Sequence, residues 1–393
     1  MSSSANDVRI VARSGPVLTA LGVVVLSYGL LQTMLVPTVG VLQRALRTGV
    51  GPASWAVLTA PLLASVVLTP LVSRLADRCG ARRVLLASLA VYLVGTVGAG
   101  LAPGIEVLIG FRAVQGIGLA LVPLSFVLVR ATLPAGRVPF GLALTAGLVT
   151  GSAGAGLLVG GLLADLLSWR WIFVLGSALV ALALLLTVLF VPTDRPRGPS
   201  IPAGGLLSRP LVVAHAGALL LGVNQFLCYV LVPRLAQLPA SAGGFGTTVT
   251  GAALILLPGT LVTIPASWAA EPLARRYRLT APLALGLLLA GGSGVALALG
   301  HGRAWQVVLG YLACSVGYGL AMAGLPRLVN HASPAAHSGS ANGANTVARV
   351  LGGAAGSQLA VLAVQLPGAG GFVTGFLLAA GAAGLGALLC RWA

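Results

Sequence analysis

The chain has 393 residues, of which 58% are hydrophobic and 7% are charged, and its formal net charge is +17. A water-soluble protein of this length needs many more polar side chains to cover its surface, so the composition excludes a soluble globular fold. The sequence contains no lysine, so the fixed positive charge of the side chains is carried by arginine.

Twelve apolar runs divide the chain, each with about the 18–25 residues that an α-helix needs to cross a hydrocarbon core of roughly 30 Å. The runs lack the alternation of apolar and polar residues that a membrane β-barrel requires. The predicted spans are 16–37, 55–72, 84–101, 106–130, 140–163, 170–191, 211–235, 249–270, 281–300, 305–328, 340–365 and 371–390. The sequence therefore predicts an all-α polytopic membrane protein embedded in a lipid bilayer.

A segment rich in proline and arginine interrupts the apolar pattern between the sixth and seventh spans. It indicates a linker between two halves of the chain. We predict a tail over 1–15, a six-helix bundle over 16–191, the linker over 192–210 and a second six-helix bundle over 211–393.

Internal similarity supports two equivalent halves. A shift of 198 residues places Leu75–Arg78 over Leu273–Arg276, and a shift of 196 places Leu35–Pro37 over Leu231–Pro233. Nearly constant offsets in separate regions indicate a repeat. Six spans in each half would relate the two bundles by an axis along the membrane normal, with a cavity between them.

The placement of the arginines predicts the orientation of the chain. Outside the apolar cores, sixteen arginines fall on the side of the amino terminus and five on the other side. Cytoplasmic loops of membrane proteins carry the excess of positive charge, so we expect both termini in the cytoplasm of a multi-pass cell-membrane protein. The charge thus indicates topology, and we expect no nucleic-acid partner. The scattered cysteines and histidines predict no metal site and no disulfide.

Five segments carry recognisable motifs. The turn Ser73–Arg82 is similar to the pattern G-x-L-A-D-R-x-G-R-R, and Arg112–Gly118 matches R-x-x-Q-G-x-G in span four. Gly156–Gly161 in span five is similar to G-P-x-x-G-G without its proline, and Ser168–Phe173 and Asn345–Gly353 are typical of the same proteins. Together these segments resemble the major facilitator superfamily, in particular its drug:proton antiporter-like branch, and the resemblance covers nearly the whole chain.

The resemblance implies two pseudo-symmetric six-helix bundles and secondary transport by alternating access. We expect export of a small hydrophobic or amphipathic compound, such as a drug or a secondary metabolite, by a monomer without a cofactor, with protons as an additional partner if transport is proton-coupled. Two alternatives stay open: a facilitator or importer of a small metabolite, including an anionic one, and a receptor or scaffold that transports nothing. No nucleophile–base pair, phosphate-binding loop or metal spacing is present, so we do not expect an enzyme.

The turn after span two is expected to act as a conformational latch. A carboxylate at the end of one helix stabilises the partial positive charge at the amino end of another. The resemblance implies that Asp77 faces the start of span eleven, near Ser340, with Arg78, Arg82 and Arg130 nearby. The alternative is a solvated loop charge that only contributes to topology.

Two arginines lie inside predicted spans, where a charge is costly unless it faces water or a partner. The resemblance implies that Arg112 and Gln115 line the cavity and organise proton or substrate exchange, although Arg112 could instead bond helix carbonyls. Arg349 could reach Asp77, bond carbonyls or attract an anionic substrate. All six acidic residues map to tails, loops or span ends, and Asp165 is the preferred candidate for proton coupling among them.

Polar side chains on apolar helices are expected to turn away from lipid, toward a substrate or another helix. The predicted cavity residues are Tyr28, Gln32, Thr33, Asn224, Gln225, Tyr229, Tyr311, Tyr318 and Asn345. The glycines of span five include small-xxx-small spacing that permits close packing. Gly151, Gly156, Gly160 and Gly161 are predicted to form a tight, sliding seam between the two halves.

Overall fold

The computed structural model describes residues 2–194, 208–333, 338–366 and 370–392. Within these residues the secondary structure is helical, and twelve helical segments are long and apolar enough to cross a membrane. The predicted all-α fold with twelve spans is confirmed. Each segment overlaps one predicted span, and most are longer because the helices continue beyond the apolar core.

The first six spans form the amino-terminal bundle. It contains α1 (Ser2–Met34), η1 (Val36–Thr38), α2 (Val39–Ala45), α3 (Val50–Ser54), the π-helical turn η2 (Trp55–Thr59), α4 (Ala60–Cys79), α5 (Ala81–Gly100), α6 (Ile105–Val114), η3 (Gln115–Ala120), α7 (Leu121–Thr132), η4 (Ala135–Arg137), α8 (Val138–Leu166) and α9 (Arg170–Phe190). Several spans are thus broken by short 3-10 or π-helical turns.

The last six spans form the carboxy-terminal bundle. It contains α10 (Arg209–Gln237), η5 (Ala240–Ala242), α11 (Val249–Trp268), α12 (Ala270–Arg276), α13 (Ala281–Leu299), α14 (Ala304–Ala332), α15 (Ser338–Val364), α16 (Gly370–Leu389) and η7 (Cys390–Trp392). Residues 195–207 of the predicted linker lie outside the described residues. The predicted tail over 1–15 is helical from Ser2 and continues directly into the first span.

Local sequence explains where helices bend and stop. Pro37 lies in the 3-10 turn after α1, where a missing backbone N–H is tolerated, and the first span then continues as α2. Gly80 separates α4 from α5 with φ of +90°, a backbone angle that L side chains rarely adopt. The turn between the second and third spans is therefore tight, as its sequence predicts.

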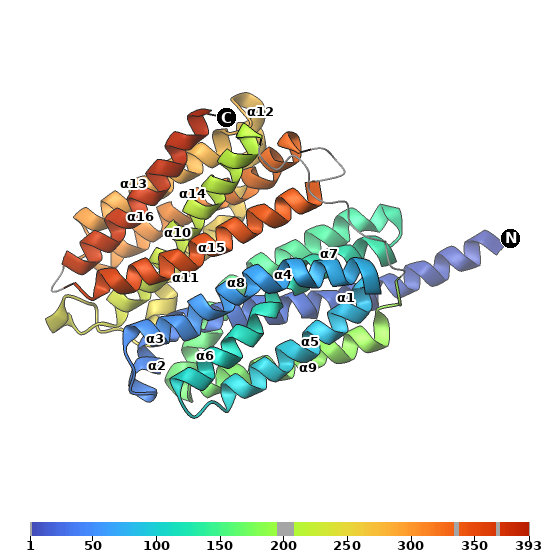
Figure 1. Cartoon of the computed structure of the whole chain (residues 1–393), viewed down its shortest axis with the longest axis horizontal. Coiled ribbons are helices and arrows are strands. Elements are labelled where there is room, and N and C mark those ends of the chain that lie inside the picture. Colours follow the sequence, from blue (N-terminus) through green and yellow to red (C-terminus); the bar gives the residue numbers. More distant parts are fainter. Residues whose placement is uncertain (1, 195–207, 334–337, 367–369, 393) are drawn as a thin grey trace.

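The two bundles lie side by side and meet unevenly (Figure 1). Their ribbons approach each other at the end that carries α2 and α3, here called the opposite face, and diverge toward the end that carries both chain termini, here called the terminal face. Helices α8 and α11 pack across the boundary, as do α4 and α15. The repeat is visible at the opposite face, where Pro37 and Pro233 line one shallow cavity between the bundles.

The glycines of α8 separate into two sets, which corrects the predicted seam. Gly156 and Gly160 pack on α1 within the same bundle, where an added Cβ would lie 2.0 Å from Thr33 Oγ1 and 2.2 Å from Met34 O. Gly161 faces the other bundle, with 2.8 Å from such a Cβ to Thr250 Cα. Positions four apart share one face of a helix, as Gly156 and Gly160 do, whereas Gly161 is rotated by about 100° from Gly160 and so faces another neighbour.

Gly151 has open space where a side chain would lie and is exposed, so it does not take part in close packing here. It lies nearer the terminal face, where the bundles diverge. The seam between the bundles is thus closed at Gly161 and open at Gly151.

Candidate functional site

A buried arginine ties three helices of the amino-terminal bundle together. Arg112, 1% exposed, donates from Nε to Ala56 O at 2.9 Å and from Nη2 to Val57 O at 2.8 Å. Its Nη1 donates to Gln115 Oε1, and Gln115 Nε2 donates to Thr96 Oγ1 at 2.8 Å. The network joins α6 and η3 to η2 and α5.

The carbonyls that accept these bonds belong to the π-helical turn η2. A π-helical turn carries an extra residue, which turns carbonyls out of the regular ladder. The guanidinium group satisfies them in a region without water. Arg112 therefore bonds helix carbonyls, which is the alternative left open by the sequence, and its predicted direct role in exchange is not supported by its contacts.

Arg349 lies within α15 and is partly exposed, unlike Arg112. Its one hydrogen bond within the described part of the chain is a long one, from Nη1 to Tyr318 Oη at 3.5 Å. The charges of Arg349 and Arg112 both act on the hydroxyl of Tyr28, which lies in α1 of the other bundle. Arg349 thus faces the boundary between the bundles at a depth where other charges are scarce.

Four of the predicted cavity residues bond or pack between helices instead. Asn224, 1% exposed, donates to Ala379 O at 3.0 Å, and Asn345, 7% exposed, donates to Ala214 O at 2.9 Å. Tyr311 is buried against Gly259 of α11. These three correct the prediction, because an apolar helix bundle also needs polar cross-links.

Thr33 is the fourth. Its hydroxyl donates to carbonyls of its own helix and to Ser152 O of α8 at 3.4 Å. It lies in the close contact with Gly156 described above. Thr33 therefore belongs to the packing of α1 on α8.

Five predicted cavity residues remain partly exposed within their spans: Tyr28, Gln32, Gln225, Tyr229 and Tyr318. Gln225 Nε2 donates to Tyr229 Oη at 3.3 Å, whereas Gln225 Oε1 is buried without a partner. An unpaired buried acceptor is costly unless a ligand or water supplies a donor. Together with Arg349, these side chains are the candidates for contact with a small molecule.

A carboxylate joins the bundles at the opposite face. Asp165, at the end of α8, accepts from Val249 N at 3.1 Å and from Thr250 N at 2.8 Å, the first residues of α11. An aspartate at this position satisfies free N–H groups and the positive end of the helix dipole. Asp165 is thus a helix cap across the boundary, and its role in proton coupling stays a prediction.

Further hydrogen bonds close the same face. Arg234 Nη1 donates to Gln43 Oε1 at 2.7 Å, and Gln237 Nε2 donates to Pro37 O at 2.7 Å. These bonds join α10 to the end of the first span, and the sequence carried no signal for them beyond polar residues near a span end.

A third cross-bundle contact lies slightly deeper. Thr59 Oγ1 is 2.8 Å from Ser357 Oγ and accepts from Gln358 Nε2 at 2.6 Å. The side-chain hydrogen bonds that join the bundles through Thr59, Asp165, Arg234 and Gln237 all lie in the half toward the opposite face.

The predicted latch at the terminal face is not assembled. Within the described part of the chain, Asp77 makes no hydrogen bond or ion pair, and Arg78 and Arg130 are exposed. Arg82 Nη2 donates to Val188 O of α9 at 3.0 Å. The four residues therefore do not contact one another in this conformation.

The carboxylate that binds this turn is Asp194, which the sequence assigned to the linker. It accepts from Ala81 N at 2.7 Å and from Arg82 N at 2.9 Å, and so caps α5. An acidic residue a few positions after a span end was the available signal, but its partner lies more than a hundred residues away.

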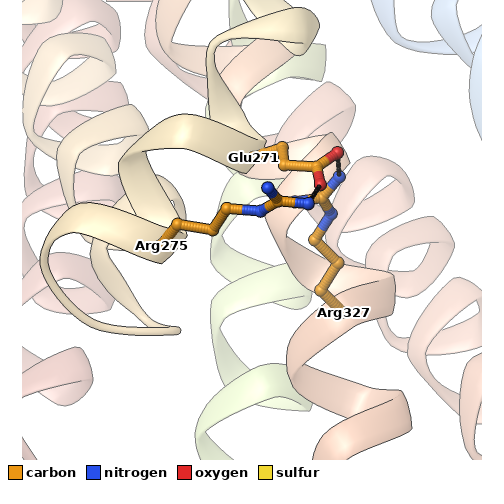
Figure 2. Close-up of polar contacts among 3 residues, drawn as sticks. All are labelled: Glu271, Arg275 and Arg327. Atoms are coloured by element: carbon orange, nitrogen blue, oxygen red, sulfur yellow. Dashed lines mark hydrogen bonds and ion pairs between the residues drawn. The ribbon is translucent and has the colours of Figure 1, made fainter.

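A charged cluster braces the terminal face of the other bundle (Figure 2). Glu271 of α12 pairs with Arg327 of α14 at 2.9 Å and with Arg275 on its own helix. These two guanidinium groups, Arg327 first, hold the pKa of Glu271 below its ordinary value. The cluster links α12 to α14 inside one bundle and does not cross the boundary.

Comparisons with known proteins agree with this architecture. The sequence profile of the Major Facilitator Superfamily matches residues 21–357. The tetracenomycin C resistance and export protein of Streptomyces glaucescens is 29% identical over 66% of this chain and 46% of its own length. The lincomycin resistance protein of Streptomyces lincolnensis is 35% identical over 39% of this chain and 31% of its own length. The methylenomycin A resistance protein of Streptomyces coelicolor is 30% identical over 57% of this chain and 46% of its own length.

The chain thus spans less than half the length of these curated relatives. Solved structures share its fold. The structure of a nucleoside transporter has a TM-score of 0.76 and 16% identity, and the match covers 95% of this chain and 99% of that chain. The inward-facing, occupied structure of a bacterial homologue of the human lysosomal transporter Spinster has a TM-score of 0.77 and 15% identity, and the match covers 95% of each chain. Because the family profile covers most of the sequence and the fold agrees, this chain is a multi-pass membrane protein that belongs to the major facilitator superfamily.

Proposed function

We propose that this protein is a secondary transporter that exports small hydrophobic or amphipathic compounds by alternating access. It works as a monomer in the cell membrane, with the terminal face in the cytoplasm. The excess of arginine on the side of the amino terminus supports this orientation.

The observation that carries the proposal is the uneven boundary between the bundles. Side-chain hydrogen bonds close it at the opposite face, and the ribbons diverge at the terminal face (Figure 1). Between these ends lie partly exposed polar groups at mid-span, including Gln225 and Arg349. This is the geometry of a carrier open to one side, with a binding region that a rocking motion can expose to the other.

The cycle requires the contacts at the two faces to form in turn. In the state described here, Asp165 caps α11, and the latch residue Asp77 has no hydrogen bond or ion pair with any of the described residues. We propose that opening toward the outside breaks the Asp165 cap while Asp77 engages the beginning of α15. Each face thereby gains a carboxylate–helix contact when the other loses one, which keeps the two states close in free energy.

Export of drug-like compounds is supported by the similarity to resistance proteins for tetracenomycin C, lincomycin and methylenomycin A. The binding region fits such compounds because apolar helices surround a few polar anchors. The buried core of both bundles is mostly leucine, valine and alanine.

The test is a susceptibility screen in an efflux-deficient bacterial host that expresses the chain, followed by transport in everted membrane vesicles. Active protein should lower susceptibility to at least one hydrophobic antibiotic and should concentrate the same compound in the vesicles. A Gly156→Leu variant serves as the inactive control, and a protonophore and an imposed pH gradient reveal whether protons contribute. Uptake into intact cells would favour the importer, and the absence of flux for every compound would indicate a receptor or scaffold.

A further inference from the structure

The centre of the membrane domain holds guanidinium groups and no carboxylate. The six acidic residues of the sequence are Asp7, Asp77, Glu106, Asp165, Asp194 and Glu271. Three lie within two residues of the end of their span, and the other three lie outside the spans. By contrast, Arg112 and Arg349 lie well inside theirs. A charge at this depth is costly unless it meets water or an opposite charge.

The two arginines differ in how their charge is used. Arg112 is buried, and its donor nitrogens bind two carbonyls and Gln115. Arg349 is partly exposed and makes only the long bond to Tyr318 within the described residues. A guanidinium group offers five N–H donors in a planar fork that matches a carboxylate. Most of the donor capacity of Arg349 is therefore open toward the boundary between the bundles.

One tyrosine hydroxyl contacts this open guanidinium: Tyr318 Oη lies 3.5 Å from Arg349 Nη1. Neutral hydroxyl groups donate hydrogen bonds to an anion and add no charge of their own. Arg349 and Tyr318 thus combine a positive charge with an O–H donor on apolar helices.

We infer that the exported compound is an amphipathic organic monoanion whose acidic group binds Arg349, with Tyr318 as a supporting donor. The inference rests on the proposed export function and names its substrate class. A cationic compound is disfavoured because it would meet two arginines and no carboxylate in the same region.

This charge also supplies a driving force. One negative charge leaves the cell in each turnover, and an inside-negative potential of about 100 mV favours that exit by about 50-fold. No proton has to be carried in return. The shallow cavity at the opposite face is lined by Arg44 and Arg234, so the outward route stays electropositive. His215, which contacts Asn345 one turn from Arg349, is a group that could exchange a proton, and the pH arm below tests that route.

The experiment uses the purified full chain and aromatic probes in matched sets, each a carboxylate, its amide and the corresponding methylammonium compound on one naphthalene, anthracene or steroid frame. Binding is measured in detergent, and efflux is measured from proteoliposomes. A potassium gradient with valinomycin sets the membrane potential, and a separate set of liposomes carries only a pH gradient. We expect carboxylates to bind at least about tenfold more tightly than their amides. Their flux should follow the potential and not the pH gradient.

Variants assign the charge recognition to Arg349. Arg349→Gln should remove the preference for carboxylates while leaving amide binding within about twofold, and Arg349→Lys should restore part of it because the charge returns without the fork. Tyr318→Phe should weaken carboxylate binding by a few fold. Arg276→Gln removes the same charge from the terminal face and should change nothing. Elution as a single folded species on size exclusion shows that the variants are intact.

The outcomes separate the two proposals. If no carboxylate binds better than its amide and ammonium partners, or if flux follows the pH gradient alone, the inference is overturned. Transport of the ammonium or neutral probes in that case leaves the export function standing. If the wild-type protein moves none of the probes and gives no resistance in the host, the export function itself fails.

Discussion

Asp165 gives the sharpest test of the proposed cycle, because one side chain holds α11 of the other bundle. Asp165→Ala removes the two bonds to Val249 N and Thr250 N. Loss of a helix cap costs about 0.5–2 kcal/mol, and the exposed position of Asp165 favours the middle of that range, about 1 kcal/mol. The contact exists only while the opposite face is closed, so the closed population should fall by about fivefold relative to the open one.

Electron–electron distances between spin labels measure this shift. One pair, at Thr48 and Ser241, reports on the opposite face, and a second, at Arg78 and Arg276, reports on the terminal face, both in a Cys79→Ser background. Asp165→Ala should increase the population with long distances in the first pair and with short distances in the second.

Thr247→Ala is the matched control. Thr247 lies just before α11 at the same face, and its side chain donates to Ala236 O of α10 at 2.8 Å, within its own bundle. The control should leave both distance distributions unchanged. Identical distributions for Asp165→Ala and the wild type would refute the reasoning, as would an equal shift in both variants.

Four further predictions concern other parts of the molecule. Arg112→Gln leaves the carbonyls of Ala56 and Val57 unpaired, which lowers the free energy of unfolding by about 1–3 kcal/mol for each carbonyl and should lower the melting temperature. A melting temperature equal to that of the wild type would show that water replaces the guanidinium group. Gly156→Ala places a Cβ against Thr33 and should destabilise the amino-terminal bundle by about 1–3 kcal/mol in thermal unfolding, while Gly151→Ala should not. Asp77→Asn should reduce transport at unchanged expression, and unchanged transport would remove the latch from the cycle. Arg327 and Arg275 lower the pKa of Glu271, so the ion pairs of Glu271 stabilise the folded state above its unfolded pKa of about 4.3. This stabilisation is lost as the pH falls through the pKa of Glu271 in the folded state, and hydrogen exchange in α12 should accelerate there. Glu271→Gln should abolish that pH dependence.

The fold was predictable because the bilayer imposes few solutions. Every backbone polar group in lipid must be satisfied within the chain, so long apolar runs become helices. The motifs around Asp77 and Arg112 then indicated the family. Individual roles were harder to predict, because a polar side chain on an apolar helix turns inward both for a ligand and for a neighbouring helix. Asn224 and Asn345 bind carbonyls of other helices, whereas Gln225 keeps an acceptor free, and composition gave no means to distinguish them.

The carboxylates show the same limit. Asp165 and Asp194 cap helices whose first residues lie more than eighty positions away in the chain, so their partners follow only from the packing of α8 on α11 and of α9 beside α5. The sequence alone determined that the chain crosses the membrane twelve times, that its halves repeat, and that its core contains arginine without acid. The tertiary structure decided which arginine is satisfied by carbonyls and which keeps open donors. The π-helical turn η2 brings the carbonyls of Ala56 and Val57 to Arg112, whereas Arg349 bonds only Tyr318 among the described residues.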